Sequence, residues 1–203
     1  EEYNPTTDTW TEKSPMPTAR WTHSACAVNG RIYVIGGGGT DSYLITADKT
    51  VTSVEMYEPA TDTWTQVSSA PRPMVLSSSA VIDGKIYVMG GDFEDFGQRV
   101  DVYDPKTNTW TRKTDMLSTR SDFGCVVLNE KIYVMGGDQG YIDQIVDYLE
   151  IYDPTKDNWT TGVPMTSKRV GLCSSMVAGK IYAIGGLAGW SQPGSKRVEV
   201  YYE

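Results

Sequence analysis

The sequence predicts an all-β fold made of four similar sheets, and three observations support this prediction. The chain of 203 residues is rich in Tyr, Gly and Pro, a composition typical of short strands joined by tight turns. A Gly-Gly doublet follows a similar apolar segment four times, and a Trp recurs in step with it. A chain of this length is expected to form a single domain, over residues 1–203.

The glycine doublets and the tryptophans mark one repeated unit. Equivalent glycines are 54, 46 and 49 residues apart, and the tryptophans are separated by the same steps. Two sequence features that recur at the same intervals indicate an internal repeat. The repeat indicates the fold class before individual strands are assigned. The residues are Gly36, Gly37, Gly90, Gly91, Gly136, Gly137, Gly185 and Gly186, with Trp10, Trp64, Trp110 and Trp159.

Four short strands are expected in each unit. Asn29-Gly30 joins the first two strands of the first unit, and such a pair favours a hairpin because both residues tolerate positive φ. A Tyr-x-Pro segment before each Trp, with Asp or Asn close behind, predicts a second reversal. The strands of the first unit are expected at Ser24 to Val28, Arg31 to Ile35, Val51 to Tyr57 and Thr63 to Gln66.

The recurring side chains are expected to be structural. A thin sheet cannot bury both faces alone, so the Tyr and Trp rings should pack between neighbouring sheets. The glycine doublets should end a strand where backbones crowd. An Arg precedes the first strand of three units, as Arg20, Arg120 and Arg169, and we expect it to bond loop carbonyls. In the second unit Met74 takes this place, and Arg72 lies two residues earlier.

The order of Arg, apolar strand, Ile-Tyr, Gly-Gly, Glu-x-Tyr-Asp-Pro and Trp resembles the kelch repeat, over essentially the whole chain. The resemblance implies a kelch-type β-propeller with four blades of four antiparallel strands. In this arrangement the N-terminal strand around Thr9 to Glu12 would complete the last blade and close the ring. The blades are then expected at about 20–66, 74–112, 120–161, and 169–203 together with 1–14.

Three arrangements agree with four repeats. They are a closed four-bladed ring, an open part of a larger propeller, and several copies in which one chain's start completes another's end. Both ends carry the third-strand pattern, because Glu1 to Pro5 and Glu199 to Glu203 both align with Glu55 to Pro59. An open blade would expose a strand edge and an apolar face, which favours association into a homo-oligomer.

Composition argues against several kinds of partner. The formal net charge of −8 argues against nucleic acid, whose binding needs clustered Lys and Arg. Cys26, Cys125 and Cys173 are far apart in the sequence and are expected to be small buried residues rather than a disulfide framework or a zinc site. No apolar run is long enough to span a membrane. We expect a soluble protein without a membrane partner, with the cytoplasm slightly favoured as its location.

Catalysis is not predicted. Some kelch-like propellers are enzymes, including copper radical oxidases, but His23 is the only histidine and leaves too few ligands for copper or for a catalytic triad. His23 shares its repeat position with Ser77, Phe123 and Leu172, which suggests packing. We therefore predict no catalytic residue, no metal and no cofactor.

A binding face is implied by the resemblance. Ligands of similar proteins meet the loops between blades and the loops after Gly-Gly, where aromatic and acidic side chains of this sequence vary between repeats. A protein or peptide partner is expected. The acidic rim agrees with a basic peptide or with calcium, although no calcium-loop spacing is present, and a solvated run of charge is the simpler explanation. The predicted contact residues are Trp21, Thr22, Tyr43, Asp92, Phe93, Asp122, Asp138, Tyr141 and Trp190.

Two other functions remain open from the sequence. One is a carbohydrate or small-ligand binding protein or a kelch-like enzyme, and the other is a structural unit that self-assembles through incomplete blades. The loop aromatics also allow a purely structural interpretation, in which their rings fold back over the blade below.

Overall fold

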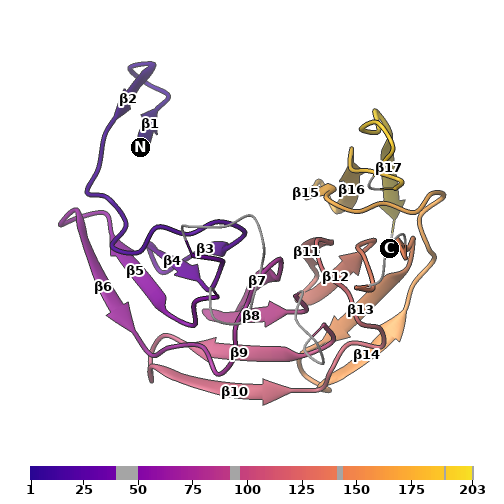
Figure 1. The fold of residues 1–203 in the computed structure, drawn as a ribbon, viewed down its shortest axis with the longest axis horizontal. Coiled ribbons are helices and arrows are strands. Elements are labelled where there is room, and N and C mark those ends of the chain that lie inside the picture. Colours follow the sequence, from indigo (N-terminus) through magenta and orange to yellow (C-terminus); the bar gives the residue numbers. More distant parts are fainter. Residues whose placement is uncertain (40–49, 92–96, 141–143, 190, 203) are drawn as a thin grey trace.

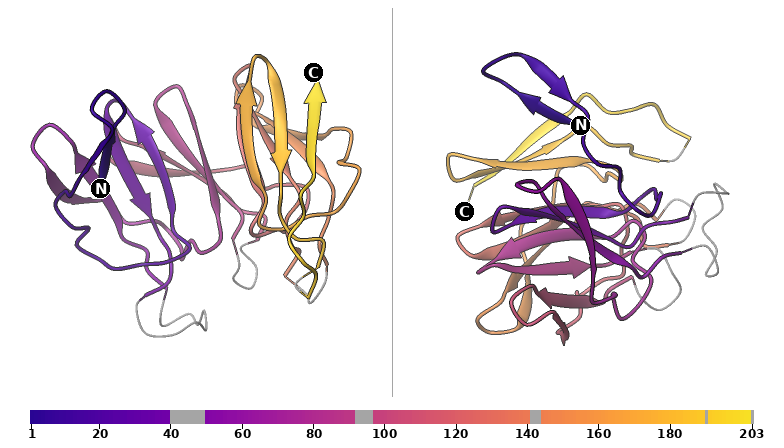
Figure 2. Two further views of the ribbon diagram at one scale, coloured as in Figure 1. Left: turned by 90° about the horizontal axis from the view of Figure 1, so that it is seen from above. Right: turned by 90° about the vertical axis from the view of Figure 1, so that its left-hand side faces the viewer.

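The computed structural model describes residues 1–39, 50–91, 97–140, 144–189 and 191–202. Within these ranges the regular elements are strands, arranged as four antiparallel blades around an arc with a separate hairpin at one end (Figure 1). Figure 2 shows the blades standing side by side, with the N-terminal hairpin and the C-terminal blade at the two tips. The predicted four-bladed all-β propeller is therefore confirmed.

Seventeen strands are present in the described residues. The N-terminal hairpin contains β1 (Glu2–Asn4) and β2 (Thr9–Thr11). Blade 1 contains β3 (Ser24–Val28), β4 (Arg31–Ile35), β5 (Val54–Glu58) and β6 (Thr63–Val67). Blade 2 contains β7 (Ser78–Ile82), β8 (Lys85–Met89), β9 (Val100–Asp104) and β10 (Thr109–Lys113). Blade 3 contains β11 (Gly124–Leu128), β12 (Lys131–Met135), β13 (Leu149–Asp153) and β14 (Asn158–Thr161). Blade 4 contains β15 (Cys173–Val177), β16 (Lys180–Ile184) and β17 (Val198–Tyr202).

Each blade is a meander that runs from the inside of the arc to the outside. Strands β3, β7, β11 and β15 lie innermost and adjoin one another, and β6, β10 and β14 form the outer edge (Figure 1). The inner strands are also linked by serine side chains. Ser78 Oγ, for example, donates to Phe123 O across the boundary between blades 2 and 3 at 3.0 Å.

The first hairpin of every blade has the predicted turn. Both central residues have positive φ, at 50° and 78° for Asn29 and Gly30, which is the type I′ geometry that suits the twist of two paired strands. Blade 3 keeps this geometry with Asn129 and Glu130, at 48° and 58°. Glu130 therefore occupies a left-handed conformation that the other blades give to glycine.

We predict that Glu130→Gly stabilises the protein. A non-glycine residue in this region costs about 1–2 kcal/mol, and the greater entropy of glycine in the unfolded chain offsets part of that gain. The expected rise in the free energy of unfolding is about 0.5–1 kcal/mol, measured by urea denaturation. Lys131→Gly, outside the turn at the start of β12, should destabilise instead, and a loss with Glu130→Gly would contradict the prediction.

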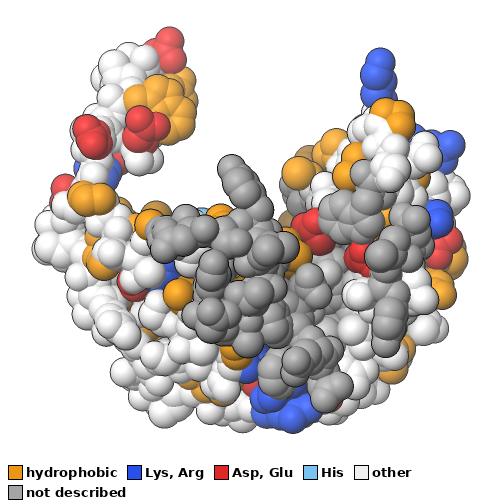
Figure 3. Space-filling model, viewed as in Figure 1, with side chains coloured by type: hydrophobic (Ala, Val, Ile, Leu, Met, Phe, Trp, Pro, Cys, Tyr) orange, Lys and Arg blue, Asp and Glu red, His pale blue; other side chains and the backbone are white. Residues whose placement is uncertain are grey.

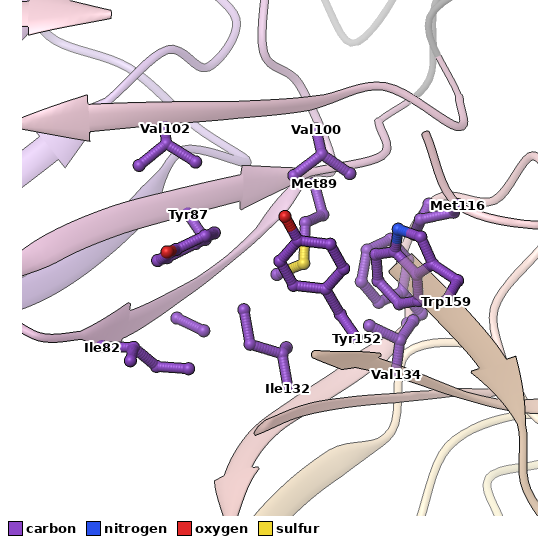
Figure 4. Packing of buried hydrophobic residues seen from close by; sticks show 12 residues of the cluster. Ile82, Tyr87, Met89, Val100, Val102, Met116, Ile132, Val134, Tyr152 and Trp159 are labelled. Atoms are coloured by element: carbon purple, nitrogen blue, oxygen red, sulfur yellow. The ribbon is translucent and has the colours of Figure 1, made fainter. Parts of the chain in front are cut away.

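The hydrophobic core lies between blades rather than within them. Figure 4 shows the cluster between blades 2 and 3, where Tyr87 and Met89 of one blade face Tyr152 and Trp159 of the next. The rings of Tyr87 and Tyr152 are 5.9 Å apart. Pairs at the same repeat positions join blades 1 and 2 and blades 3 and 4 at the same distance, through Tyr33–Tyr103 and Tyr133–Tyr201.

In blades 1 to 3 the glycine doublet ends the second strand where the next blade approaches. Gly36 has φ 65°, and a Cβ added there would lie 2.2 Å from Met74 O of blade 2. Gly37 has φ 101° and donates its amide to the same carbonyl at 2.8 Å. The doublet is therefore a junction between blades, where a side chain would push the neighbouring backbone away.

The expected closure of the ring does not form. Strand β2 pairs with β1, and blade 4 remains a three-stranded sheet ending in β17. The hairpin and blade 4 lie at opposite tips of the arc (Figure 1). The physical reason is that β1 carries the same strand pattern as β17, and a partner a few residues away costs much less chain entropy to pair than one at the other end of the chain.

The cysteines differ in exposure. Cys26 and Cys125 are half-buried, whereas Cys173 is exposed, so the expectation that all three are buried is wrong for Cys173. Cys173 lies on the last blade, whose face is not covered by a further described blade. Burial raises the pKa of the Cys26 thiol to about 11 and that of Cys125 to about 12, which keeps both as unreactive thiols at neutral pH.

Candidate recognition face

A buried arginine lies beneath the loop face in each blade. Arg120 donates from Nη1 to Gly136 O and Tyr148 O, both at 3.3 Å, and pairs through Nη2 with Glu150 at 2.5 Å. Arg20 and Arg169 make the corresponding bonds in blades 1 and 4 and pair with Glu55 and Glu199. The arginine ties the end of the second strand to the start of the third and thereby holds these two strand ends together.

The carboxylate partners were not singled out from the sequence. Their signal is the Glu of the recurring Glu-x-Tyr pattern, and the four positions are Glu55, Asp101, Glu150 and Glu199. Burial raises the pKa of Glu199, but the Thr166 amide and the Arg169 guanidinium outweigh it and lower the pKa to about 2.

Blade 2 reaches the same arrangement from a different position. Met74 occupies the arginine position and is completely buried. Arg72, two residues earlier, donates to Asp101 at 2.7 Å and to Arg99 O at 3.4 Å. These acceptors match the Glu150 carboxylate and the Tyr148 carbonyl that Arg120 contacts in blade 3. Blade 2 thus retains the ion pair, although its arginine comes from a different repeat position and its acid is Asp rather than Glu.

A ladder of backbone hydrogen bonds runs across the blades beside the inner strands. Leu76 N donates to Thr22 O at 3.2 Å, Asp122 N to Leu76 O at 3.0 Å, and Gly171 N to Asp122 O at 2.9 Å. All four residues have φ between 50° and 63°. This shared conformation brings one residue from each blade into a continuous row, and their side chains differ in every repeat.

Trp21 and Thr22 lie at the start of this row in blade 1, and both are half-buried. The Trp21 indole donates to Gly39 O at 3.0 Å, and its backbone pairs with Gly38. Thr22 Oγ1 donates to Trp21 O at 2.7 Å. The indole therefore folds over the start of its own loop and leaves only part of its ring for a partner.

Asp122 and Asp138 form an acidic pair on blade 3. Asp138 is buried and bridges Ser121 through the backbone, while Asp122 is half-buried. Burial, together with the negative charge of Asp138, raises the pKa of Asp122. Figure 3 shows acidic side chains exposed on the inner side of the arc, beside apolar side chains. A cation placed here would relieve the repulsion between the two carboxylates.

The structure therefore brings four of the predicted contact residues to one face: Trp21, Thr22, Asp122 and Asp138. The other five, Tyr43, Asp92, Phe93, Tyr141 and Trp190, lie outside the described residues. His23 is exposed rather than packed, unlike buried Ser77, Phe123 and Leu172 at the same repeat position, because no described blade covers this face of blade 1.

Within the described ranges, no three His, Cys, Asp or Glu side chains are grouped closely enough to hold a metal ion. The same ranges contain no helix of the length and hydropathy needed to cross a membrane.

Repeated four-stranded blades, glycine junctions and an arginine–carboxylate pair in every blade define a kelch-type propeller. The sequence matches the KLHDC2/KLHL20/DRC7 Kelch-repeats domain over residues 2–186. The chain belongs to the kelch-repeat family.

Similar proteins include kelch proteins of very different organisms. Kelch-like protein 36 of Rattus norvegicus is 39% identical over 90 residues, which is 44% of this chain and 14% of that protein. Beta-scruin of Limulus polyphemus is 39% identical over 82 residues, or 40% and 8% of the two chains. An F-box/kelch-repeat protein of Arabidopsis thaliana is 35% identical over 90 residues. The matched region spans 22% of that protein's length, so the chain resembles only part of each of these relatives.

The fold is also similar to that in a solved structure, the structure of YjhT. The TM-score is 0.83 at 19% sequence identity, over 95% of this chain and 72% of that chain. This likeness concerns the fold alone.

Proposed function

We propose that this chain is a non-catalytic binding scaffold that recognises a protein or peptide with a basic side chain at the row of Thr22, Leu76, Asp122 and Gly171. The observation that carries the proposal is the Asp122–Asp138 pair, where burial and like charge raise the pKa of Asp122. A Lys or Arg side chain seated there would form charge-assisted hydrogen bonds with both acids.

The rest of the row supports specific recognition. Its backbone is held by three hydrogen bonds between blades, so its side chains are presented on a rigid frame, which lowers the entropy lost on binding. The side chains themselves are a hydroxyl, an isobutyl group, a carboxylate and a hydrogen. A bound segment lying along the row would thus meet different chemistry on each blade.

We predict that Asp122→Asn weakens binding of Lys- and Arg-containing peptides on a peptide array by about tenfold to a hundredfold, the range expected for losing a hydrogen bond to a charged group. Asp83→Asn is the matched control, because Asp83 has a similar φ of 51° but lies in an exposed hairpin turn. Array binding that depends on basic residues but is the same for Asp122→Asn and Asp83→Asn would refute the placement of the site.

Lowering the pH should weaken peptide binding, whereas it should relieve a destabilisation of the free protein. Binding of a basic peptide should fall as the pH drops through the raised pKa of Asp122, because the carboxylate becomes neutral. In the free protein the raised pKa means that ionised Asp122 opposes folding. Asp122→Asn should therefore stabilise the free protein at neutral pH, and this gain should vanish below the ordinary Asp pKa of 3.8. Urea denaturation at neutral pH and again below pH 3.8 measures this gain in stability.

A further inference from the structure

An open cavity of about 320 Å³ lies on blade 3, apart from the row that begins at Thr22. Leu117 and Tyr148 line it together with Pro164. Leu117 is 54% exposed and Tyr148 is 48% exposed. Large apolar side chains that remain exposed around a cavity are typical of a binding surface.

The cavity lies on the side of blade 3 that faces blade 2. Side chains alternate between the two faces of a strand, so Tyr148 shares a face with Tyr152, and Thr161 shares a face with Trp159. Figure 4 shows Tyr152 and Trp159 in the cluster between blades 2 and 3. Leu117 belongs to the link between these two blades. Each of them has a neighbouring blade on both sides (Figure 1), so the cavity is away from both tips of the arc.

The apolar lining is peculiar to blade 3. Scaffold features such as the glycine doublet recur in every repeat, whereas Tyr148 and Leu117 do not, so the fold itself does not require them. Their matching residues in the other blades are small, polar, charged or proline. For Tyr148 these residues are Ser53, Arg99 and Arg197, and for Leu117 they are Pro17, Pro71 and Thr166.

The charge at the cavity is already balanced. Glu150 is the one charged residue among the described lining residues, and it accepts from Arg120, from Ser118 Oγ and from the Leu117 amide. The electrostatic complement of this lining is therefore an uncharged side chain. Pockets for whole small ligands measure about 300–1,000 Å³, so a cavity at the lower end of this range suits a single large side chain.

Strand β14 offers a free edge beside the cavity. It is the outermost strand of blade 3, and no other described strand pairs with its outer side (Figure 1). Gly162 N donates to Leu149 O at 2.8 Å. Because directly bonded pairs alternate along an antiparallel ladder, the backbone N–H and C=O groups of Trp159 and Thr161 point away from β13. Thr161 also lines the cavity, so its free backbone groups lie next to it.

We propose that an extended segment of a partner protein pairs with the outer edge of β14 and places a large apolar side chain in the cavity between Leu117 and Tyr148. The backbone of Thr161 donates one hydrogen bond to this segment and accepts another. Addition of a strand to an exposed sheet edge derives affinity from main-chain hydrogen bonds and specificity from pockets for alternate side chains. The proposal does not depend on the row that begins at Thr22.

The composition of β14 supports this pairing. Charged side chains on an edge strand discourage the addition of another strand. Strand β10 of blade 2 ends in Arg112 and Lys113, whereas Asn158–Thr161 contains no charged residue. Strand β6 of blade 1 is also uncharged, but it has no matching apolar cavity, because Ser53 stands where blade 3 has Tyr148.

The test is the selection of binding peptides from a phage-displayed library of random heptapeptides, followed by fluorescence anisotropy with the selected peptides. We expect peptides that share a large apolar residue among β-forming residues. Thr161→Pro removes the outward N–H and leaves the β13–β14 ladder intact, a change that edge strands tolerate, and it should weaken binding about tenfold. Gln66→Pro makes the same change at the matching position of β6 and should bind as the unchanged chain does.

Two further variants test the cavity. Tyr148→Ser and Leu117→Thr introduce the residues that blades 1 and 4 carry at these positions, so both variants should remain folded in thermal melts. Each should weaken binding about tenfold, because apolar contact with the seated side chain is lost. In the unchanged chain, peptide binding should slow hydrogen exchange of the Thr161 amide and leave that of the Gln66 amide unaltered.

Four results would overturn the proposal. The first is a selection that yields no binding peptide. The second is binding that neither Thr161→Pro nor Tyr148→Ser weakens, and if Asp122→Asn abolishes that binding, the peptides occupy the row that begins at Thr22. The third is binding that needs Tyr148 but not the Thr161 N–H, since the occupant would then lie in the cavity without pairing with β14. The fourth is unchanged exchange of the Thr161 amide, which decides the matter if Thr161→Pro does not fold.

Discussion

Replacing Arg120 by Ala is expected to lower the free energy of unfolding by about 3–5 kcal/mol, the cost of leaving a buried charge without its partner. Arg120 is completely buried, and its partner Glu150 is only 2% exposed. The substitution also removes the donors to the carbonyls of Gly136 and Tyr148 and to Ser118 Oγ. Urea denaturation followed by tryptophan fluorescence measures the change.

Two companion variants separate the charge from the packing. Arg112→Ala removes an arginine whose side chain is 54% exposed and pairs with Asp115, so it should cost at most about 1 kcal/mol. In the double variant Arg120→Met with Glu150→Gln no uncompensated charge remains, and part of the lost stability should return. Equal losses for Arg120→Ala and Arg112→Ala would contradict the structural importance of the buried pair.

Gly36→Ala is the second substitution with a large expected effect. Left-handed φ at a non-glycine residue costs about 1–2 kcal/mol, and the new methyl group would lie 2.2 Å from Met74 O. Met74 belongs to the neighbouring blade, so the junction between blades must open. Overpacking adds about 1–3 kcal/mol, and we expect a total loss of about 2–5 kcal/mol in urea denaturation.

Gly30→Ala is the matched control for this substitution. Gly30 lies in the same blade at φ 78°, but an added Cβ there would meet nothing within 4 Å. Only the conformational cost of about 1–2 kcal/mol remains. If both alanines cost the same, the close approach of the blades at Gly36 contributes nothing to stability.

The repeat itself could be predicted from the sequence because its signals are local. Hairpin turns such as Asn29-Gly30 and strand ends such as Gly36-Gly37 are decided by φ and by neighbours within a few residues. The four-stranded blade follows from these signals, and the strands of blade 1 lie within three residues of their expected bounds. The variable positions beside the inner strands were also visible as unlike residues at matching places.

The ion pair between Arg72 and Asp101 could not be predicted from the sequence. A single repeat shows an arginine out of place at Arg72 and a shorter acid at Asp101, but only the structure shows that the two changes meet. The row from Thr22 to Gly171 is another case. Its residues are neighbours only because blades stack, and stacking joins positions about fifty residues apart in the sequence.

Four kelch-type blades, their turns and their interior aromatic rings were therefore determined by the sequence alone, since each depends on short-range chemistry repeated four times. Tertiary structure decided how the blades end. Whether β2 pairs with β1 or with β17 depends on which of two similar strands lies close, and the curvature set by three junctions between blades keeps β2 away from β17. The curvature of the arc comes from packing between blades, and the sequence of a single repeat does not determine that packing.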